Sequence, residues 1–202
     1  FLNGNFLVLG EKKVLTSTTG ENGSWTTVDT GANGILRSAT FSNSLNKYVV
    51  VGDSGTIITS ANLTAWTPSN VYSGADTVED NILDVSFGNG NLLIALAEGG
   101  KLIKTSDALT WVEEGQTVND AVGITFANYN LVVVGALGAI AFSQDSYNWQ
   151  PGNSGSNKDL NYITHVNGKF IAVGNQSEIV INTDRIEMHH QKSDVSLFNL
   201  DD

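Results

Sequence analysis

Hydrophobic and polar residues alternate along this chain in short runs that recur at a nearly constant interval. Each apolar run, such as residues 131–134, follows a short anchor that begins with an aromatic residue and ends in Asn. The anchors begin at Phe41, Phe87 and Phe126, with a weaker copy at His165. Short Val- and Ile-rich runs separated by Gly, Asn, Asp and Ser turns are typical of β-strands, so the pattern predicts an all-β chain with almost no helix.

Four tryptophans mark the same repeat. Trp25, Trp66, Trp111 and Trp149 follow one another at intervals of 41, 45 and 38 residues, and Met188 stands where the next would fall. A period of this length with four short strands is typical of β-propeller blades, each of which buries its faces only against its neighbours. We therefore predict one β-propeller domain, residues 1–202, with five four-stranded blades. The predicted blades span about residues 1–30, 31–70, 71–115, 116–152 and 153–190.

The first strand of the predicted blades has a regular alternation. One residue before the anchor lies a hydroxyl side chain, and two residues before it lies an apolar one. The hydroxyl positions are Thr40, Ser86, Thr125 and Thr164, and the apolar positions are Ala39, Val85, Ile124 and Ile163. Alternation with a period of two residues predicts inner strands with two different faces.

The first blade lacks its inner strand, because Phe1 already stands at the anchor. Residues 194–199 read Asp-Val-Ser-Leu-Phe-Asn, close to Asp-Val-Ser-Phe-Gly-Asn at residues 84–89. Because closure of a ring removes the exposed edges of its sheets, we predict that residues 191–202 supply the missing strand. The alternative is that they link the domain to something else. A first residue other than Met indicates a processed chain or an excised piece.

A polar turn precedes each tryptophan, at residues 19–25, 60–66, 105–111 and 143–149. The last copy reads Ser-Gln-Asp-Ser-Tyr-Asn-Trp. This turn resembles the Asp-box, or BNR, repeat of sialidase-like and photosystem II assembly factor-like β-propellers, written Ser-x-Asp-Gly-x-x-Trp. Every copy departs from that pattern: Asp becomes Asn62 in one copy, and the following Gly becomes Ala108 in another. The resemblance covers nearly the whole chain and implies a propeller fold, not an activity.

The physical role of such a turn is to staple a hairpin. An Asp or Asn side chain accepts hydrogen bonds from backbone N–H groups of its own turn, while the Trp packs between blades and donates its indole N–H to a carbonyl oxygen. The residues assigned this structural role are Trp25, Asn62, Trp66, Asp107, Trp111, Asp145 and Trp149.

The sialidase resemblance implies a chemical test. That family binds the sialate carboxylate with three arginines and uses a tyrosine nucleophile. This chain contains only Arg37 and Arg185, so it cannot assemble the triad. We therefore expect no enzyme activity and no catalytic residue, and we expect Arg37, on an inner strand, to line the central channel.

Composition narrows the class of partner. The chain is 41% hydrophobic and 15% charged, as in a globular domain, and its net charge of −11 disfavours nucleic acid and anionic lipid. The absence of cysteine excludes disulfides, thiolate metal sites and a cysteine nucleophile. No apolar stretch approaches the roughly 20 residues that span a bilayer. Adjacent His189 and His190 would point to opposite faces of a strand, so we expect no metal site there.

Ten of the 21 Asp and Glu residues fall in loops that a propeller places on one face, which we expect to be strongly acidic. The ligand-binding candidates on or near this face are Arg37, Tyr72, Asp76, Glu79, Asp80, Glu98, Glu113 and Asp120. Residues 67–81 form the longest predicted loop and are the first choice for contact. The face would suit a cationic partner, a Ca²⁺ ion or a sugar stacked on Tyr72, with no other cofactor. The alternative is that its charge only keeps the protein soluble.

Three functions are open at this point. The first is a non-catalytic recognition or adhesion propeller, extracellular or on a virion as a tail fibre or surface protein, that binds a glycan or protein through its loop face. The second is an Asp-box glycan hydrolase, and the third is a structural component of a larger assembly. A hydrolase needs paired carboxylates beside a cationic clamp, and the sequence supplies carboxylates without the clamp.

Overall fold

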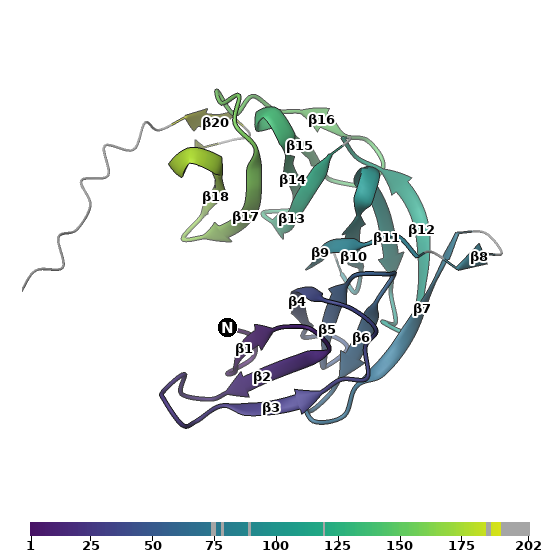
Figure 1. Ribbon diagram of the computed structural model, residues 1–202. Coiled ribbons are helices and arrows are strands. Elements are labelled where there is room, and N and C mark those ends of the chain that lie inside the picture. Colours follow the sequence, from purple (N-terminus) through teal and green to yellow (C-terminus); the bar gives the residue numbers. More distant parts are fainter. Residues whose placement is uncertain (74–75, 78, 89, 119, 185–186, 191–202) are drawn as a thin grey trace, which may run out of the picture.

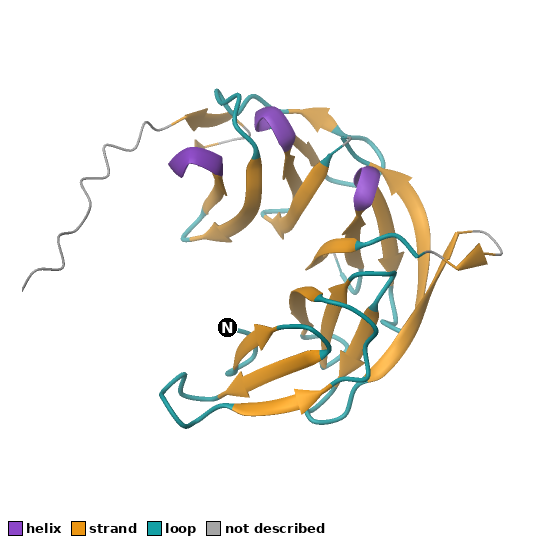
Figure 2. Ribbon diagram, in the orientation of Figure 1, coloured by secondary structure: helices purple, strands orange, loops and turns teal. Residues whose placement is uncertain are grey.

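The computed structural model describes residues 1–73, 76–77, 79–88, 90–118, 120–184 and 187–190. Within them nearly every element is a β-strand, and the exceptions are single 3₁₀ turns at Glu98–Gly100, Ala136–Gly138 and Asn175–Ser177 (Figure 2). The strands form small sheets arranged around a common centre, so the predicted all-β propeller fold is confirmed (Figure 1). In this part of the chain no helix is long and apolar enough to cross a membrane.

The sheets follow one another in chain order. The first contains β1 (Phe6–Leu9), β2 (Lys13–Ser17) and β3 (Thr26–Asp29). The second contains β4 (Leu36–Ser42), β5 (Lys47–Gly52), β6 (Ile57–Ser60) and β7 (Thr67–Ser73), and the third β9 (Ile82–Phe87), β10 (Leu93–Ala97), β11 (Lys101–Thr105) and β12 (Thr110–Gln116). The fourth contains β13 (Ala121–Ala127), β14 (Asn130–Gly135), β15 (Ile140–Ser143) and β16 (Gln150–Pro151), and the fifth β17 (Leu160–Val166), β18 (Lys169–Gly174), β19 (Ile179–Asp184) and β20 (Glu187–His190). Because the first sheet has three strands among the described residues, the count of five four-stranded blades stays a prediction.

The second and third sheets are joined at their outer strands. β7 and β12 pair in parallel, with Val71 opposite Trp111, and β8 (Asp76–Thr77) pairs with β7. The β7–β8 hairpin projects from the outer rim in Figure 1. Residues 67–73 therefore lie in a strand, and the expectation that residues 67–81 form one long loop is wrong. Pairing between segments this far apart in the chain leaves no local signal in the sequence.

The inner strands β4, β9, β13 and β17 surround the centre (Figure 1). Each shows a shift in pairing near its start, where one extra residue bulges from the strand: Arg37, Leu83, Val122 and Asn161. Such bulges bend a strand and strengthen its twist. After the bulge, successive side chains alternate between the centre and the neighbouring sheet.

The apolar core lies between the sheets. Four clusters of buried apolar residues each combine side chains from two successive sheets. Leu96 of the third sheet and Val133 of the fourth, for example, belong to one cluster and are completely buried. Full burial of a large apolar side chain stabilises by about 1.5–3 kcal/mol, so each sheet depends on its neighbours for stability.

The closing strand predicted within residues 191–202 lies outside the described residues, and so does Arg185. β20 pairs with β19, as the fourth strand of a blade should, but the side chains of His189 and His190 are not described.

Candidate binding site at the centre of the propeller

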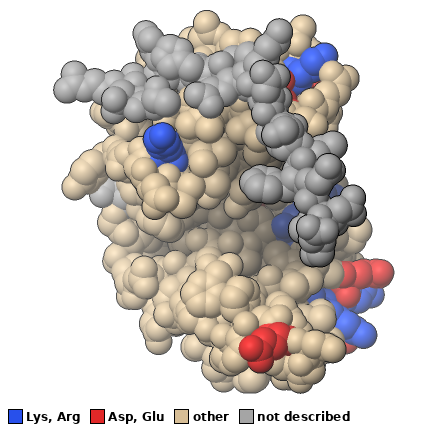
Figure 3. Space-filling model, turned by 90° about the vertical axis from the view of Figure 1, so that its left-hand side faces the viewer, with Lys and Arg blue, Asp and Glu red and all other residues tan. Residues whose placement is uncertain are grey.

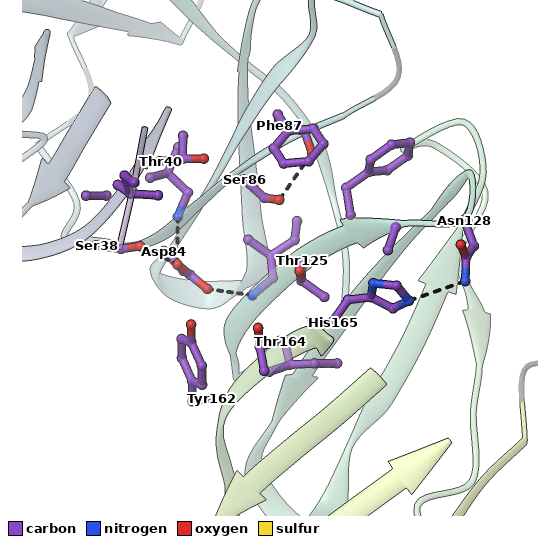
Figure 4. A pocket seen from close by; sticks show the side chains of 17 residues that line it. Ser38, Thr40, Asp84, Ser86, Phe87, Thr125, Asn128, Tyr162, Thr164 and His165 are labelled. Carbon is purple, nitrogen blue, oxygen red and sulfur yellow. Dashed lines mark hydrogen bonds between the residues drawn. The ribbon is translucent and has the colours of Figure 1, made fainter. Parts of the chain in front are cut away.

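The inner strands enclose a cavity of about 500 Å³, called here the central pocket. The inner strands of four successive sheets each contribute one hydroxyl side chain at the same position, and these are Thr40, Ser86, Thr125 and Thr164 (Figure 4). They occupy the same position in each inner strand. Because side chains of a β-strand alternate between its two faces, every second side chain points toward the centre. Leu2, which precedes β1, also borders the pocket.

Asp84 is the only carboxylate among the described residues that line this pocket. Its Oδ1 accepts hydrogen bonds from Ser38 Oγ at 2.5 Å and from the Val85 N–H at 2.9 Å, and its Oδ2 accepts one from the Ile124 N–H at 2.8 Å. Burial raises the pKa of Asp84, and these hydrogen bonds offset part of that rise. Because Ser38 belongs to the second sheet and Ile124 to the fourth, the carboxylate links three sheets.

The hydroxyl positions are more available to a ligand than this carboxylate. Ser86 Oγ donates to the carbonyl oxygen of Phe87 at 3.1 Å. The hydroxyls of Thr40, Thr125 and Thr164 have no hydrogen-bond partner in the described part of the chain. Each hydroxyl can donate one hydrogen bond and accept two, so the pocket offers a row of polar groups with unused capacity.

Aromatic rings border the mouth of the pocket. Phe87 is 49% exposed, and the Phe126 ring meets it edge-on with ring centroids 5.8 Å apart. Tyr162 is 55% exposed, and His165 Nε2 lies 3.3 Å from Asn128 Nδ2 (Figure 4). No Lys or Arg is found among the lining residues that the structure describes, so the pocket has no cationic group to attract an anion.

The acidic face lies at the other end of the inner strands, where each strand begins. A second cavity there, of about 460 Å³, is bordered by Leu83, Val122, Asn161, Glu98, Asp120 and Asp159. The predicted candidates Glu98 and Asp120 therefore do come together. In the described ranges, no three His, Asp or Glu side chains lie close enough to share a metal ion.

Hydrogen bonds engage much of the polar surface of this face. Asn81 Oδ1 accepts a hydrogen bond from the Ser54 N–H, between β5 and β6 of the second sheet, at 3.0 Å. Its Nδ2 donates to Glu98 Oε1 at 2.8 Å. Asp159 links the fourth and fifth sheets in the same way. It accepts hydrogen bonds from the Leu137 N–H at 2.9 Å and from Asn175 Nδ2 at 3.1 Å. These side chains hold successive sheets together, so their charge and polarity already have a structural use.

Two further candidates are held in ion pairs. Arg37 pairs with Asp53 and borders neither of these two cavities, and that it lines the central channel stays a prediction. It lies in the bulge of the inner strand β4. Asp80 accepts a hydrogen bond from Lys101 Nζ at 2.6 Å, which raises the pKa of Lys101.

The remaining candidates are dispersed. Tyr72 lies on β7 and Glu113 on β12, the outer strands, away from the central pocket. Glu79 is exposed, and the side chain of Asp76 is outside the description. The structure thus brings only part of the predicted set to one place.

The turns before the tryptophans are held by their own side chains. Asp107 Oδ1 accepts the N–H groups of Leu109 at 2.8 Å and Thr110 at 3.0 Å, which lowers the pKa of Asp107. Asp145 holds its turn in the same way, and Asn62 does so with a neutral amide oxygen.

The tryptophans differ from expectation in one respect. Trp111 is completely buried in the cluster between the second and third sheets. The indole N–H groups of Trp66, Trp111 and Trp149 have no hydrogen-bond partner among the described residues, so the expected bond to a carbonyl oxygen is wrong for these three. The rings lie against apolar side chains, and their contribution is packing.

The sequence carries one signal for the central pocket that is easily missed. A hydroxyl recurs at Thr40, Ser86, Thr125 and Thr164, but the alternation by itself predicts strands and does not say which face is open. Only the arrangement of the inner strands shows that this face lines a cavity.

No protein-family model and no curated protein matches the sequence. Solved structures match the fold. YCF48 bound to D1 peptide superposes with a TM-score of 0.59 at 18% identity, over 77% of this chain and 54% of that one. The WD40 β-propeller domain of Doa1 superposes with a TM-score of 0.63 at 14% identity, over 93% of this chain and 65% of that one. The extracellular domain of a putative one-component system from B. thetaiotaomicron superposes with a TM-score of 0.69 at 11% identity, over 96% of this chain and 30% of that one.

This chain therefore spans about half of the YCF48 chain and less than two thirds of the other two. At these identities the likeness shows the β-propeller fold alone.

Proposed function

We propose that this chain is a non-catalytic recognition β-propeller that binds an extended segment of a partner protein in its central pocket. The proposal is carried by the row of hydroxyls without partners, Thr40, Thr125 and Thr164, beside exposed aromatic rings. An extended peptide backbone has donors and acceptors for hydroxyls, and its apolar side chains pack on aromatic rings. The YCF48 chain, whose structure holds a D1 peptide, supports a peptide as the class of ligand.

The chemistry of the pocket supports recognition over catalysis. General acid–base chemistry needs a carboxyl group placed to exchange a proton with the substrate. Both oxygens of Asp84 instead accept hydrogen bonds from the protein. The lack of Lys and Arg among the described lining residues favours a neutral segment over an anionic ligand such as a sialoside.

Two finer parts of the proposal concern family and location. We propose that the turns at Asn62, Asp107 and Asp145 are degenerate Asp-boxes, which their bonds to the N–H groups of their own turns support. We also propose a location outside a cell or on a virion surface; among the proteins that share the fold, one is an extracellular domain.

Selection from a library of random displayed peptides tests the ligand class. We expect peptides to be selected, and we expect Thr125→Val/Thr164→Val to weaken their binding about tenfold, because each lost hydrogen bond contributes about 0.5–1.5 kcal/mol. Valine keeps the shape of threonine and removes only the hydroxyl. Thr26→Val, at an exposed threonine of β3, is the matched control and should bind like the parent.

Two results would count against the proposal. Peptides that bind equally well to the double variant would place the binding site elsewhere on the molecule. Binding on a glycan array that the double variant loses would favour a sugar as the ligand of this pocket.

A further inference from the structure

One position of the inner strands decides how neighbouring sheets are linked beside the central pocket. It is the first paired residue after the bulge of each strand and is here called the linking position. The four linking residues are Ser38, Asp84, Gly123 and Tyr162. Asp84 Oδ2 accepts the N–H of Ile124, which directly follows the linking position of the next sheet, at 2.8 Å. The equivalent donor in the fifth sheet is Ile163, but the linking residue of the fourth sheet, Gly123, has no side chain to accept its N–H.

The N–H of Ile163 points away from the sheet to which it belongs. A turn of two residues, 167–168, both with positive φ, joins β17 to β18, so Val166 and Lys169 form a hydrogen-bonded pair. Hydrogen-bonded and non-hydrogen-bonded pairs alternate along an antiparallel ladder, which makes Ile163 and Ala172 a non-hydrogen-bonded pair. The N–H of Ile163 therefore lies on the free edge of β17, where the strand faces the centre of the propeller.

No side chain among the described residues accepts a hydrogen bond from this N–H. A Cβ at Gly123 would lie 3.4 Å from the Ile163 nitrogen, so a side chain at the linking position would reach this N–H as Asp84 reaches that of Ile124. Ile163 is 2% exposed and borders the central pocket. Buried backbone N–H groups nearly always have an acceptor, so the Ile163 N–H is a donor that a molecule in the pocket can use.

The surroundings of this donor favour a neutral acceptor. Asp84 already places a carboxylate in the pocket, and no Lys or Arg is among the described lining residues. Figure 3 views the molecule from the side where the first and fifth sheets lie, and the hollow seen there is lined largely by residues that are neither acidic nor basic. A second carboxylate would add like charge beside Asp84 without a cation to offset it, whereas an amide oxygen accepts the same hydrogen bond without charge.

We propose that the bound segment places an amide carbonyl oxygen against the Ile163 N–H, at the place that corresponds to the Asp84 carboxylate at the preceding junction. The inference rests on the proposed function and names the group of the segment that the pocket recognises. The amide belongs to the backbone of the segment or to an Asn or Gln side chain. Its N–H groups can donate to the hydroxyls of Thr125 and Thr164, which border the same pocket.

Amide hydrogen exchange followed by NMR tests the proposal on Ile163 itself. In the free chain, its N–H should exchange about tenfold faster than that of Ile124, because only Ile124 has a side-chain acceptor. The tightest-binding peptide from the displayed library should slow the exchange of Ile163 about tenfold and leave Ile124 unchanged. A bound peptide that leaves the Ile163 amide unaffected, or equal exchange of the two amides in the free chain, would overturn the proposal.

Gly123→Asn gives the chain an amide oxygen of its own at this place. It should slow the exchange of Ile163 without any peptide, and it should weaken peptide binding about tenfold, because the donor is already taken. Gly123→Ala is the matched control, since it adds the same Cβ, 3.2 Å from a methyl group of Val134, but no acceptor. It should weaken binding much less, and far-UV circular dichroism should be the same for both. Equal losses would trace the effect to crowding and contradict the proposal.

Changes in the peptide distinguish the two sources of the amide. If replacing one Asn or Gln of the peptide by Ala abolishes the response of Ile163, the amide is a side chain, and if the response survives every such replacement, it is a backbone carbonyl. A library that yields no peptide would refute the proposed function and the amide contact together. Peptides that need the hydroxyls of Thr125 and Thr164 but bind equally well to Gly123→Asn would refute the amide contact alone.

Discussion

The junction between the third and fourth sheets and the open faces of the fifth and first sheets are built from the same residue types. In the closed junction, Leu96 and Val133 are completely buried. At the equivalent open positions, Val173 and Val8 are 39% and 48% exposed. The apolar pattern along the strands is therefore the same in both regions, and the difference lies in whether a neighbouring sheet within the described residues packs on the face. A repeat sequence specifies which faces are to be buried, while its position in the array decides what buries them.

The closed junctions also carry polar links that act together with this packing. Asp84 joins three sheets through Ser38 and Ile124, and Asn81 joins two through its amide group. Because these groups are buried or half-buried, they specify how the sheets meet as well as stabilising the contact.

The largest contrast is expected from truncating equivalent residues in the two regions. Leu96→Ala should lower the free energy of unfolding by about 2–5 kcal/mol, because it leaves a cavity in a closed junction. Val173→Ala should lower it by less than about 1 kcal/mol, because much of that side chain already contacts water. Urea unfolding followed by tryptophan fluorescence measures both.

The experiment needs a dilute sample in which any self-association is negligible. Equal losses for the two variants would mean that the fifth sheet is covered within the monomer, and the contrast between closed and open junctions would then be false.

A smaller loss is expected from removing the carboxylate that links the sheets. Asp84→Ala leaves the N–H groups of Val85 and Ile124 without their acceptor, and we expect a loss of about 1–3 kcal/mol in the free energy of unfolding. Asp29→Ala, at an exposed carboxylate of β3, is the control and should cost much less. If the two variants unfold at the same urea concentration, Asp84 does not hold the sheets together.

The pH dependence of this contribution has a definite sign. Burial raises the pKa of Asp84 above its ordinary value of 3.8, so between these two pKa values the folded state binds the proton more than the unfolded state does. The stability that Asp84 contributes should therefore fall as pH rises through that window. Asp84→Asn should remove this component, which a series of urea curves at different pH values would detect.

Most of the fold could be predicted because its signals are local. The alternation of Val85 and Ser86 before the anchor at Phe87 predicts an inner strand there, and the structure has β9 at Ile82–Phe87. The parallel pairing of β7 with β12 could not be predicted in this way, because it joins two outer strands from different periods of the chain. Sequence periodicity describes each strand and its own faces, but not which distant edge it meets.

The candidate site was harder to predict because a sequence shows which side chains are charged, but not which polar groups are free to bind a ligand. Glu98 and Asp159 stand out as carboxylates, yet each accepts hydrogen bonds that hold sheets or turns together. Thr125 and Thr164 are ordinary neutral residues, and only their place on the inner strands turns them toward a shared cavity. In both cases the role of the side chain depends on contacts with residues far away in the sequence.

The smallest effect is expected in the turns before the tryptophans, which offer a second internal comparison. Asn62 holds its turn with a neutral oxygen, and Asp107 holds the equivalent turn with a carboxylate. Bonds from the N–H groups of Leu109 and Thr110 lower the pKa of Asp107 below its ordinary value of 3.8. As pH falls, the unfolded chain binds this proton first, so the stability that Asp107 contributes is present above pH 3.8 and is lost as pH falls through its folded pKa.

Asp107→Asn should therefore change the stability at pH 7 little and make acid unfolding less steep, because the amide oxygen keeps the same bonds without a proton to gain. Asn62→Asp is the opposite change in the equivalent turn and should make acid unfolding steeper. Circular dichroism at a series of pH values between neutral and strongly acidic measures both. If the two substitutions shift the acid transition in the same direction, the carboxylate does not act through the hydrogen bonds of its turn, and the difference between the two turns lies in their surroundings.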